Sequence, residues 1–120
     1  FSEDFAFFKT HFSAEYKNEN FVLEKNTRGV IYVVRDPRDV CISWSKHSGL
    51  KYDDSIEFLL NNDSIIKWTD VDSQNYYPEN TPVYLSRWDN HVVSWSKISK
   101  NIPILTIRFE DLVYEKEEQY

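Results

Sequence analysis

Two short apolar runs stand out along the chain. Val30 to Val34 is continuously apolar, and Ile104 to Ile107, after Pro103, repeats its β-branched character. Continuous runs of this length favour strands covered on both faces in a parallel sheet over half-exposed antiparallel strands. Segments of helical character lie between the two runs, and parallel neighbours need such crossover connections. The pattern predicts an α/β fold.

The first run leads directly into a predicted helix from about Pro37 to Ser48. Asp36 suits the N-cap position, and Pro37 suits the first helical position. Asp39 would lie near the positive end of the helix dipole, and Gly49 would end the helix. One face is apolar and suits packing on the sheet; it carries Val40, Cys41 and Trp44.

Two other segments carry helical spacing. Ser55 to Leu60 predicts a second, short helix. Thr81 and Pro82 suit the cap and first position of a third helix. The apolar stripe of that third helix has steps of three and four residues: Tyr84, Trp88, Val92, Trp95 and Ile98.

The remaining segments are less periodic. Asn61 to Asn80 is polar and aromatic and predicts mostly loop, with a turn of helix around Ile65 to Trp68. Within it, Trp68 to Tyr77 would either line a substrate pocket or form a surface loop, and both interpretations stay open. The acidic tail from Glu110 to Tyr120 predicts the start of a further helix.

Length, charge and cysteine content narrow the class of protein. With 120 residues, 41% of them hydrophobic, the chain is long enough for one core, and its net charge of −6 argues against a nucleic-acid partner. The lone Cys41 excludes an internal disulfide, and we expect a cytoplasmic protein. No apolar run approaches the roughly 18 residues that cross a bilayer, so we expect no membrane contact in this segment. The chain starts at Phe1 and lacks methionine, so we expect part of a longer protein.

A cluster of charges follows the first predicted strand. Arg35 would end that strand, and the carboxyl ends of parallel strands border the crevice where ligands bind. Its guanidinium suits a phosphate or sulfate, and Ser43, about two helical turns after Asp36, would return to the same side. The alternative is a solvated corner in which Arg35 and Arg38 pair with Asp36 and Asp39. The residues alone leave both interpretations open.

A second candidate site lies near the start of the chain, in the sequence FFKTHF. Lys9 and His11 are two residues apart, so in an extended strand their side chains lie on the same face. A single histidine is more often a surface residue or a hydrogen-bonded core residue. His47 and His91 fall in predicted helices, and we assign both a structural role.

Four segments in this order, FFKTH, VIYVVRDPRDVCISW, SRWDNHVVSW and ILTIRFEDL, resemble the PAPS-dependent sulfotransferase family. The resemblance covers most of the chain apart from residues 61–80. It implies a P-loop-like three-layer α/β fold with a central parallel sheet. It also implies transfer of a sulfuryl group from PAPS to a hydroxyl or amine of a small-molecule acceptor, with PAP as the product and no metal.

The resemblance assigns roles to individual residues. Arg35 and Ser43 match the arginine and serine that bind the 3′-phosphate, and Lys9 and His11 match the family's lysine and catalytic histidine. Phe109 stands where a tyrosine usually precedes EDL near the nucleotide; it keeps the ring and lacks the hydroxyl. The segments SRWDNHVVSW and RFEDL are otherwise expected to be structural.

The resemblance also bears on domain organisation. Residues 1–120 would be the central part of a single sulfotransferase domain, lacking the glycine-rich phosphosulfate loop and the C-terminal nucleotide-binding segment. We therefore expect this segment alone to be inactive. The alternative is a noncatalytic nucleotide-binding or protein-interaction module that retains the fold. A P-loop kinase relative fits less well, because no magnesium-binding carboxylate arrangement is visible.

Overall fold

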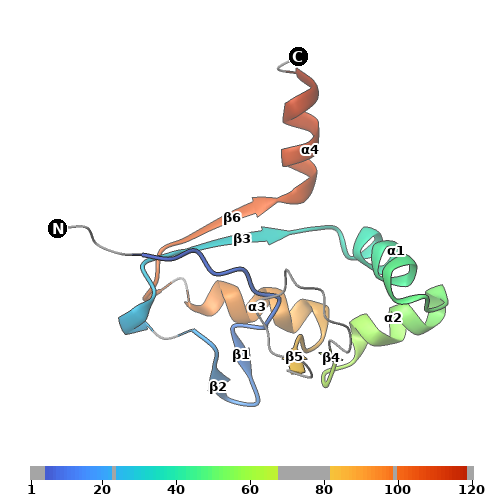
Figure 1. Cartoon of the computed structure of the whole chain (residues 1–120), viewed down its shortest axis with the longest axis horizontal. Helices are drawn as coiled ribbons and strands as arrows, with labels where there is room; N and C mark the ends of the chain where they lie inside the picture. Colours follow the sequence, from blue (N-terminus) through green and yellow to red (C-terminus); the bar gives the residue numbers. More distant parts are fainter. Residues whose placement is uncertain (1–4, 23, 68–81, 99, 119–120) are drawn as a thin grey trace.

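A computed structural model describes residues 5–22, 24–67, 82–98 and 100–118, with side chains up to residue 114 in the last range. Helices and short strands are interspersed along these residues (Figure 1). The elements are β1 (Glu15–Tyr16), β2 (Glu19–Asn20), η1 (Glu24–Asn26), β3 (Val30–Val34), α1 (Pro37–Ser48), α2 (Tyr52–Leu60), β4 (Ile65–Lys67), β5 (Pro82–Tyr84), α3 (Trp88–Ile98), β6 (Ile104–Arg108) and α4 (Phe109–Glu118). No helix in these ranges is long and apolar enough to cross a membrane.

The two apolar runs form the parallel sheet that the sequence predicts. Strand β3 pairs with β6 in parallel, with Val30 opposite Ile104 and Val34 opposite Arg108. The two strands lie side by side, and both end at the same edge of the sheet (Figure 1). The α/β class is therefore confirmed, and the sheet edge carries the first residues of two following helices.

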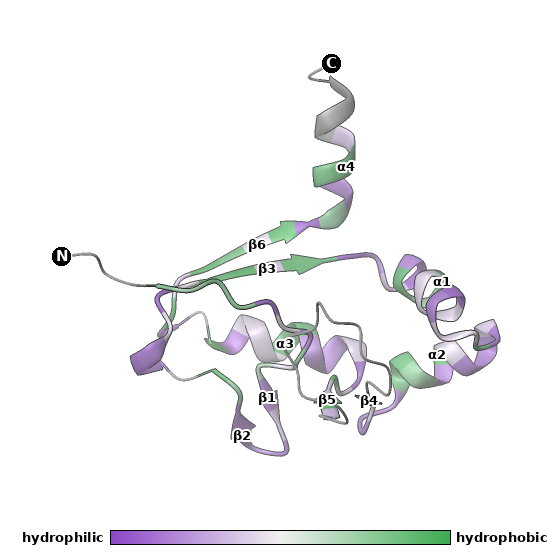
Figure 2. Cartoon of the chain, in the orientation of Figure 1, coloured by the Kyte–Doolittle hydropathy of each residue, from purple (hydrophilic) through white to green (hydrophobic). Residues whose placement is uncertain are grey.

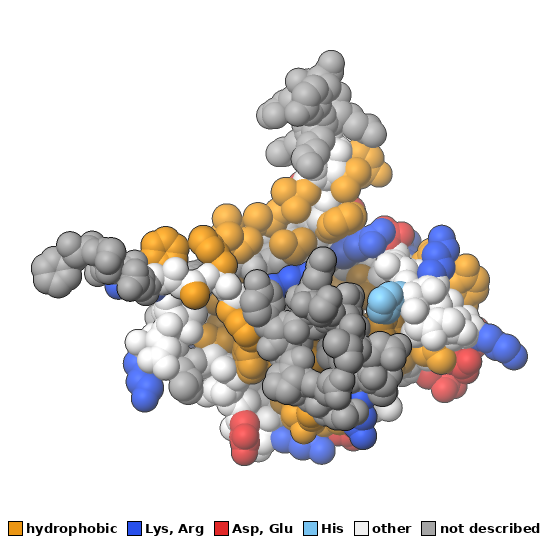
Figure 3. Space-filling view, viewed as in Figure 1, with side chains coloured by type: hydrophobic (Ala, Val, Ile, Leu, Met, Phe, Trp, Pro, Cys, Tyr) orange, Lys and Arg blue, Asp and Glu red, His pale blue; other side chains and the backbone are white. Residues whose placement is uncertain are grey.

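The prediction that β3 is covered on both faces is wrong for the described residues. The face with Tyr32 packs on α3, whereas on the other face Ile31 is 64% exposed and Leu105 is 59% exposed. Figure 2 shows both strands as hydrophobic, and Figure 3 shows hydrophobic side chains gathered along β6 and the start of α4. A continuous apolar run indicates that burying both faces of a strand would be favourable, but it does not identify the residues that cover each face.

Helix α1 begins and ends where the sequence predicts. The Asp36 carboxylate accepts a hydrogen bond from the Arg38 backbone N–H at 2.9 Å, and Pro37 occupies the first turn. Gly49 ends the helix in the left-handed conformation at φ 71°, which a residue without a Cβ adopts at low cost. The α1–α2 contact includes buried Cys41, whose thiol donates to the Tyr52 carbonyl at 3.8 Å. Helix α2 begins three residues before the predicted start at Ser55.

Two predicted helical segments are strands instead. Pro82–Tyr84, expected to open the third helix, is strand β5, and Ile65–Lys67, expected as a helical turn, is strand β4. The two strands pair antiparallel, with Ile66 opposite Val83. Proline is tolerated at the first residue of a strand, and a short apolar run alone does not distinguish helix from strand. These two segments are strands because each pairs with the other. Thr81 and the segment from Trp68 to Tyr77 lie outside the described residues.

Helix α3 begins at Trp88 and supplies the main aromatic residue of the core. Trp95 is 4% exposed and stacks on Tyr32 of β3, with ring centroids 5.7 Å apart. Ala14 and Val83 are also fully buried, at 0% exposure each. The core therefore lies between α3, the Tyr32 face of the sheet and the segment that follows the FFKTHF sequence.

A short hairpin near the start of the chain was not predicted. Strands β1 and β2 pair antiparallel around Lys17 and Asn18, whose φ angles are 50° and 65°. Two consecutive residues with positive φ are typical of the two-residue turns that connect hairpin strands. Asparagine tolerates this conformation and lysine rarely adopts it, so the turn carries little signal in the sequence.

Candidate functional site

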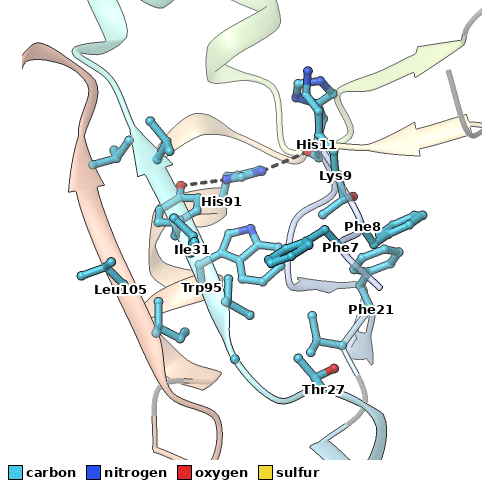
Figure 4. A pocket seen from close by; sticks show the side chains of 18 of the residues that line it. Phe7, Phe8, Lys9, His11, Phe21, Thr27, Ile31, His91, Trp95 and Leu105 are labelled. Atoms are coloured by element: carbon cyan, nitrogen blue, oxygen red, sulfur yellow. Dashed lines mark hydrogen bonds between the residues drawn. The ribbon is translucent and has the colours of Figure 1, made fainter. Parts of the chain in front are cut away.

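A pocket of about 1530 Å³ brings three of the predicted site residues together. Lys9 and His11 line it from the first segment, and Arg35 lines it from the end of β3. Tyr32 and His91 also line this pocket. Residues from distant parts of the sequence therefore border one hollow, which Figure 4 shows from close by.

Lys9 and His11 share an orientation, although no strand forms here. Residues 5–11 have no regular secondary structure, so no extended strand aligns the two side chains. Figure 4 nevertheless shows both side chains projecting in the same direction, away from Phe7 and Phe8. Desolvation by the surrounding chain lowers the pKa of the His11 imidazole, and the Lys9 ammonium lowers it further. The His11 imidazole is therefore biased toward its neutral, proton-accepting form at neutral pH.

Helix α3 holds the backbone that follows His11. The Trp95 indole N–H donates to the Phe12 carbonyl at 3.1 Å. Ser94 Oγ accepts a hydrogen bond from the Ala14 backbone N–H at 3.0 Å. These contacts satisfy backbone groups that lie outside regular secondary structure, where an unpaired buried group is costly. The candidate base thus lies at the end of a fixed segment.

His91 of the same helix connects this segment to the sheet. Its Nε2 lies 3.1 Å from the His11 carbonyl oxygen, and its Nδ1 lies 3.0 Å from the Tyr32 hydroxyl. Dashed lines in Figure 4 mark both hydrogen bonds. Burial lowers the pKa of His91 and raises the pKa of Tyr32 to about 12, so both side chains are neutral near pH 7.

Arg35 stacks on Phe109 at the edge of the sheet. The central carbon of the guanidinium lies 4.6 Å from the centre of the Phe109 ring. The Arg35 Nε is buried and has no hydrogen-bond partner among the described residues. A guanidinium that lies flat on a ring keeps its N–H edge available for a planar or tetrahedral anion. Two residues 74 positions apart, each at the end of a parallel strand, thus form one unit.

The neighbouring charges pair with one another. The Arg38 guanidinium donates to the Asp36 carboxylate at 2.6 Å, and the hydrogen bonds from Arg38 lower the pKa of Asp36 to about 2. The Asp36 backbone N–H donates to the Glu110 carboxylate at 2.8 Å, which links α1 to α4 and lowers the pKa of Glu110. The solvated-corner interpretation thus describes Arg38. No ion pair joins Arg35 to Asp36 or Asp39, all three of which the structure describes.

The sulfotransferase domain family model matches residues 2–119, nearly the whole chain. The chain belongs to the sulfotransferase domain family. No curated protein and no solved structure matched it. The family resemblance inferred from the four sequence segments is thereby confirmed.

Two predicted residues of this sulfotransferase domain lie outside the pocket wall. Ser43 is exposed on α1 and makes no side-chain hydrogen bond to another described residue. Phe109 does not line the pocket itself, but it stacks on Arg35, which does. The roles of Ser43, Arg35 and Phe109 toward a nucleotide therefore stay predictions.

Sequence reasoning did not assign Tyr32 or His91 to the site of this sulfotransferase domain. Tyr32 interrupts an otherwise aliphatic strand, and a polar tip within such a run often marks a hydrogen-bond partner in the core. His91 has the spacing of a helix stripe, which predicted packing and gave no indication of its hydrogen bonds.

Proposed function

We propose that the protein is a sulfotransferase that transfers a sulfuryl group from PAPS to a hydroxyl or amine of a small-molecule acceptor. The proposal rests on the family and on one observation: a single pocket is lined by Lys9, His11 and Arg35. A base can accept the proton of the attacking group, and an ammonium and a guanidinium can bind and stabilise the negative charge of an anionic group during its transfer. The parallel pair β3 and β6 supports a P-loop-like fold with a central parallel sheet.

His11 is the proposed general base. Its lowered pKa favours the neutral imidazole, which would accept the proton of the acceptor as that group attacks sulfur. Lys9, whose side chain projects in the same direction, would stabilise negative charge that develops on the transferred group and on the departing phosphate. No metal is needed in this scheme.

Arg35 is the proposed ligand of the 3′-phosphate. PAPS, when bound, supplies the activated sulfuryl group. The residues present suit an anion of this kind, because the buried Arg35 Nε has no partner among the described residues and Phe109 supports the guanidinium from one side. Ser43 is the proposed second ligand. The chain has two glycines, so it does not itself supply a glycine-rich phosphosulfate loop, and we expect transfer from the intact protein rather than from these 120 residues.

Transfer of labelled sulfate from PAPS by the intact protein tests the proposal. We expect His11→Ala to lower kcat by roughly 10²- to 10⁴-fold, the usual contribution of a general base, with little change in PAP affinity. The matched control is His47→Ala, which removes an exposed histidine on α1. In the wild-type protein the acid limb of the pH profile should lie below about pH 6.5, the ordinary histidine pKa.

Three results would count against this scheme. Undiminished transfer by His11→Ala would remove His11 from the mechanism. Binding of PAP without any transfer would instead indicate the noncatalytic nucleotide-binding module. Absence of PAP binding in calorimetry would contradict both functions.

A further inference from the structure

We propose that His91 is a positioning residue for the candidate base His11, held as a single tautomer by the hydrogen bonds of its two ring nitrogens to the His11 carbonyl and the Tyr32 hydroxyl. The inference rests on the proposed function, because it assigns His91 to the reaction of that site. The observation behind it is a continuous hydrogen-bonded chain from the sheet to the His11 backbone. That chain runs from the Tyr32 hydroxyl through both nitrogens of His91 to the His11 carbonyl.

The chemistry of the two partners fixes the tautomer of His91. A backbone carbonyl only accepts hydrogen bonds, so the Nε2 atom that lies 3.1 Å from the His11 oxygen must carry the proton. In the neutral ring, Nδ1 is then an acceptor, and the Tyr32 hydroxyl donates to it across 3.0 Å. The alternative tautomer would place a lone pair against the His11 carbonyl oxygen. The raised pKa of Tyr32 keeps its hydroxyl protonated over the working pH range.

The ring of His91 is also held in place by packing. It stacks on the Tyr32 ring, with centroids 5.9 Å apart, and Trp95 one helical turn later stacks on the same tyrosine. The His91 N–H therefore has a fixed direction toward the His11 carbonyl. A neutral ring needs no counter-ion in this half-buried place, which agrees with its lowered pKa.

This arrangement would affect the rate of catalysis, because residues 5–11 form no regular secondary structure and no ladder of strand hydrogen bonds positions them. Helix α3 donates to two consecutive backbone carbonyls of this segment: His91 donates to that of His11, and Trp95 donates to that of Phe12. Loss of the His91 hydrogen bond would leave the His11 carbonyl without this donor, while the Trp95 hydrogen bond to the Phe12 carbonyl would remain. Misplacement of a catalytic group by about 1 Å costs up to roughly 100-fold in rate.

Two isosteric variants test the inference in the intact protein. Gln places its amide N–H₂ near the Nε2 position and keeps the donor to the His11 carbonyl, whereas Asn ends near Nδ1 and does not reach it. We expect His91→Asn to lower kcat by roughly 10- to 100-fold with PAP affinity unchanged, and His91→Gln to recover most of that loss. Equal kcat for His91→Asn and wild type would overturn the proposal, and so would equal losses in both variants.

Nuclear magnetic resonance provides readouts that do not depend on activity. The ¹⁵N shifts of His91 should show a protonated Nε2, and Tyr32→Phe, which removes the donor to Nδ1, should leave Nε2 protonated because the His11 carbonyl still accepts from it. Titration of the His11 resonances should give a changed pKa in His91→Asn and an unchanged one in His91→Gln. A protonated Nδ1 in the wild type would overturn the proposal. These spectra decide the inference even if the protein transfers no sulfate, which would contradict the proposed function alone.

Discussion

Two regions of the domain carry the candidate chemistry, and they are built differently. The strand-end corner comprises Arg35, Asp36, Phe109 and Glu110, where β3 and β6 finish side by side. The clamped segment is the backbone of residues 11–14. Hydrogen bonds to α3 and β5 fix its position. The corner holds a buried Arg35 Nε with no partner among the described residues. In the clamped segment, the polar groups that face α3 are paired.

Because of this difference, substitutions in one region should affect folding stability and substitutions in the other should affect anion binding. Removing one partner of a buried, paired polar group leaves the other unsatisfied, so changes around the clamped segment should mainly cost folding free energy. A guanidinium whose Nε has no hydrogen-bond partner among the described residues adds little hydrogen-bond energy to folding and has donor capacity left for a ligand, so changes at Arg35 should mainly cost anion binding. The two regions should therefore respond in opposite ways to two measurements, unfolding and PAP binding.

The largest effect is expected from Trp95→Ala. This side chain is 4% exposed, stacks on Tyr32 and donates to the Phe12 carbonyl. Its removal should lower the free energy of unfolding by about 3–5 kcal/mol, the usual cost of truncating a buried aromatic residue. Equilibrium urea unfolding with linear extrapolation measures this loss.

Trp95→Phe is the matched control for the clamped segment. It keeps an aromatic ring against Tyr32 and removes the indole N–H, so it should recover a large part of the loss and leave the Phe12 carbonyl without its donor. A loss below about 1 kcal/mol in Trp95→Ala would contradict the view that α3 fixes this backbone.

An intermediate effect is expected from Arg35→Ala at the corner. We expect PAP affinity to fall by roughly 10- to 100-fold, because hydrogen bonds to charged groups contribute about 1.5–3 kcal/mol each. The free energy of unfolding should change much less than in Trp95→Ala. Calorimetric titration of PAP into the intact protein measures the affinity.

Arg38→Ala is the matched control for Arg35→Ala. Both arginines lie within the same four residues, but Arg38 is exposed and already pairs with Asp36. It should leave PAP affinity within about threefold, since an exposed charge near a phosphate contributes little once salt screens it. Equal losses from the two alanine variants would show that net charge, and not the strand-end position of Arg35, determines binding.

The Arg35 and Asp36 half of the strand-end corner could be predicted from sequence because its geometry is local, whereas its contacts with Phe109 and Glu110 span 74 positions. A strand, an N-cap and a helix that starts with Pro37 determine where Arg35 lies, and each of these carries a residue signature. The parallel partner followed from a second apolar run, Ile104 to Ile107, and the observed strand extends one residue further to Arg108. The α/β class, β3, α1 and β6 thus followed from periodicity and capping alone.

The clamped segment could not be predicted in the same way. His91 lies 80 positions from His11, and nothing in the spacing of a helix stripe indicates which backbone oxygen a side chain will reach. The prediction that Lys9 and His11 share a face assumed an extended strand, yet the backbone of FFKTHF is irregular and its last two carbonyls accept hydrogen bonds from side chains of α3. The strands β4 and β5 were missed for a related reason, because their assignment depends on pairing with each other across a long interval.

The smallest effect is expected from Asp36→Asn, which tests whether the corner contributes to folding at all. Its pKa, lowered to about 2 by hydrogen bonds from Arg38, lies below the ordinary value of 3.8, so the charged carboxylate stabilises the fold above that ordinary pKa. This stabilisation should be lost as pH falls from about 4 towards 2. Asparagine still caps a helix and has no charge, so urea midpoints of the variant should lie below wild type at pH 5 and converge with it near pH 2. Arg38→Gln, which removes the partner instead, should give the same convergence, and a gap that stays constant down to pH 2 would show that the ion pair does not stabilise the corner.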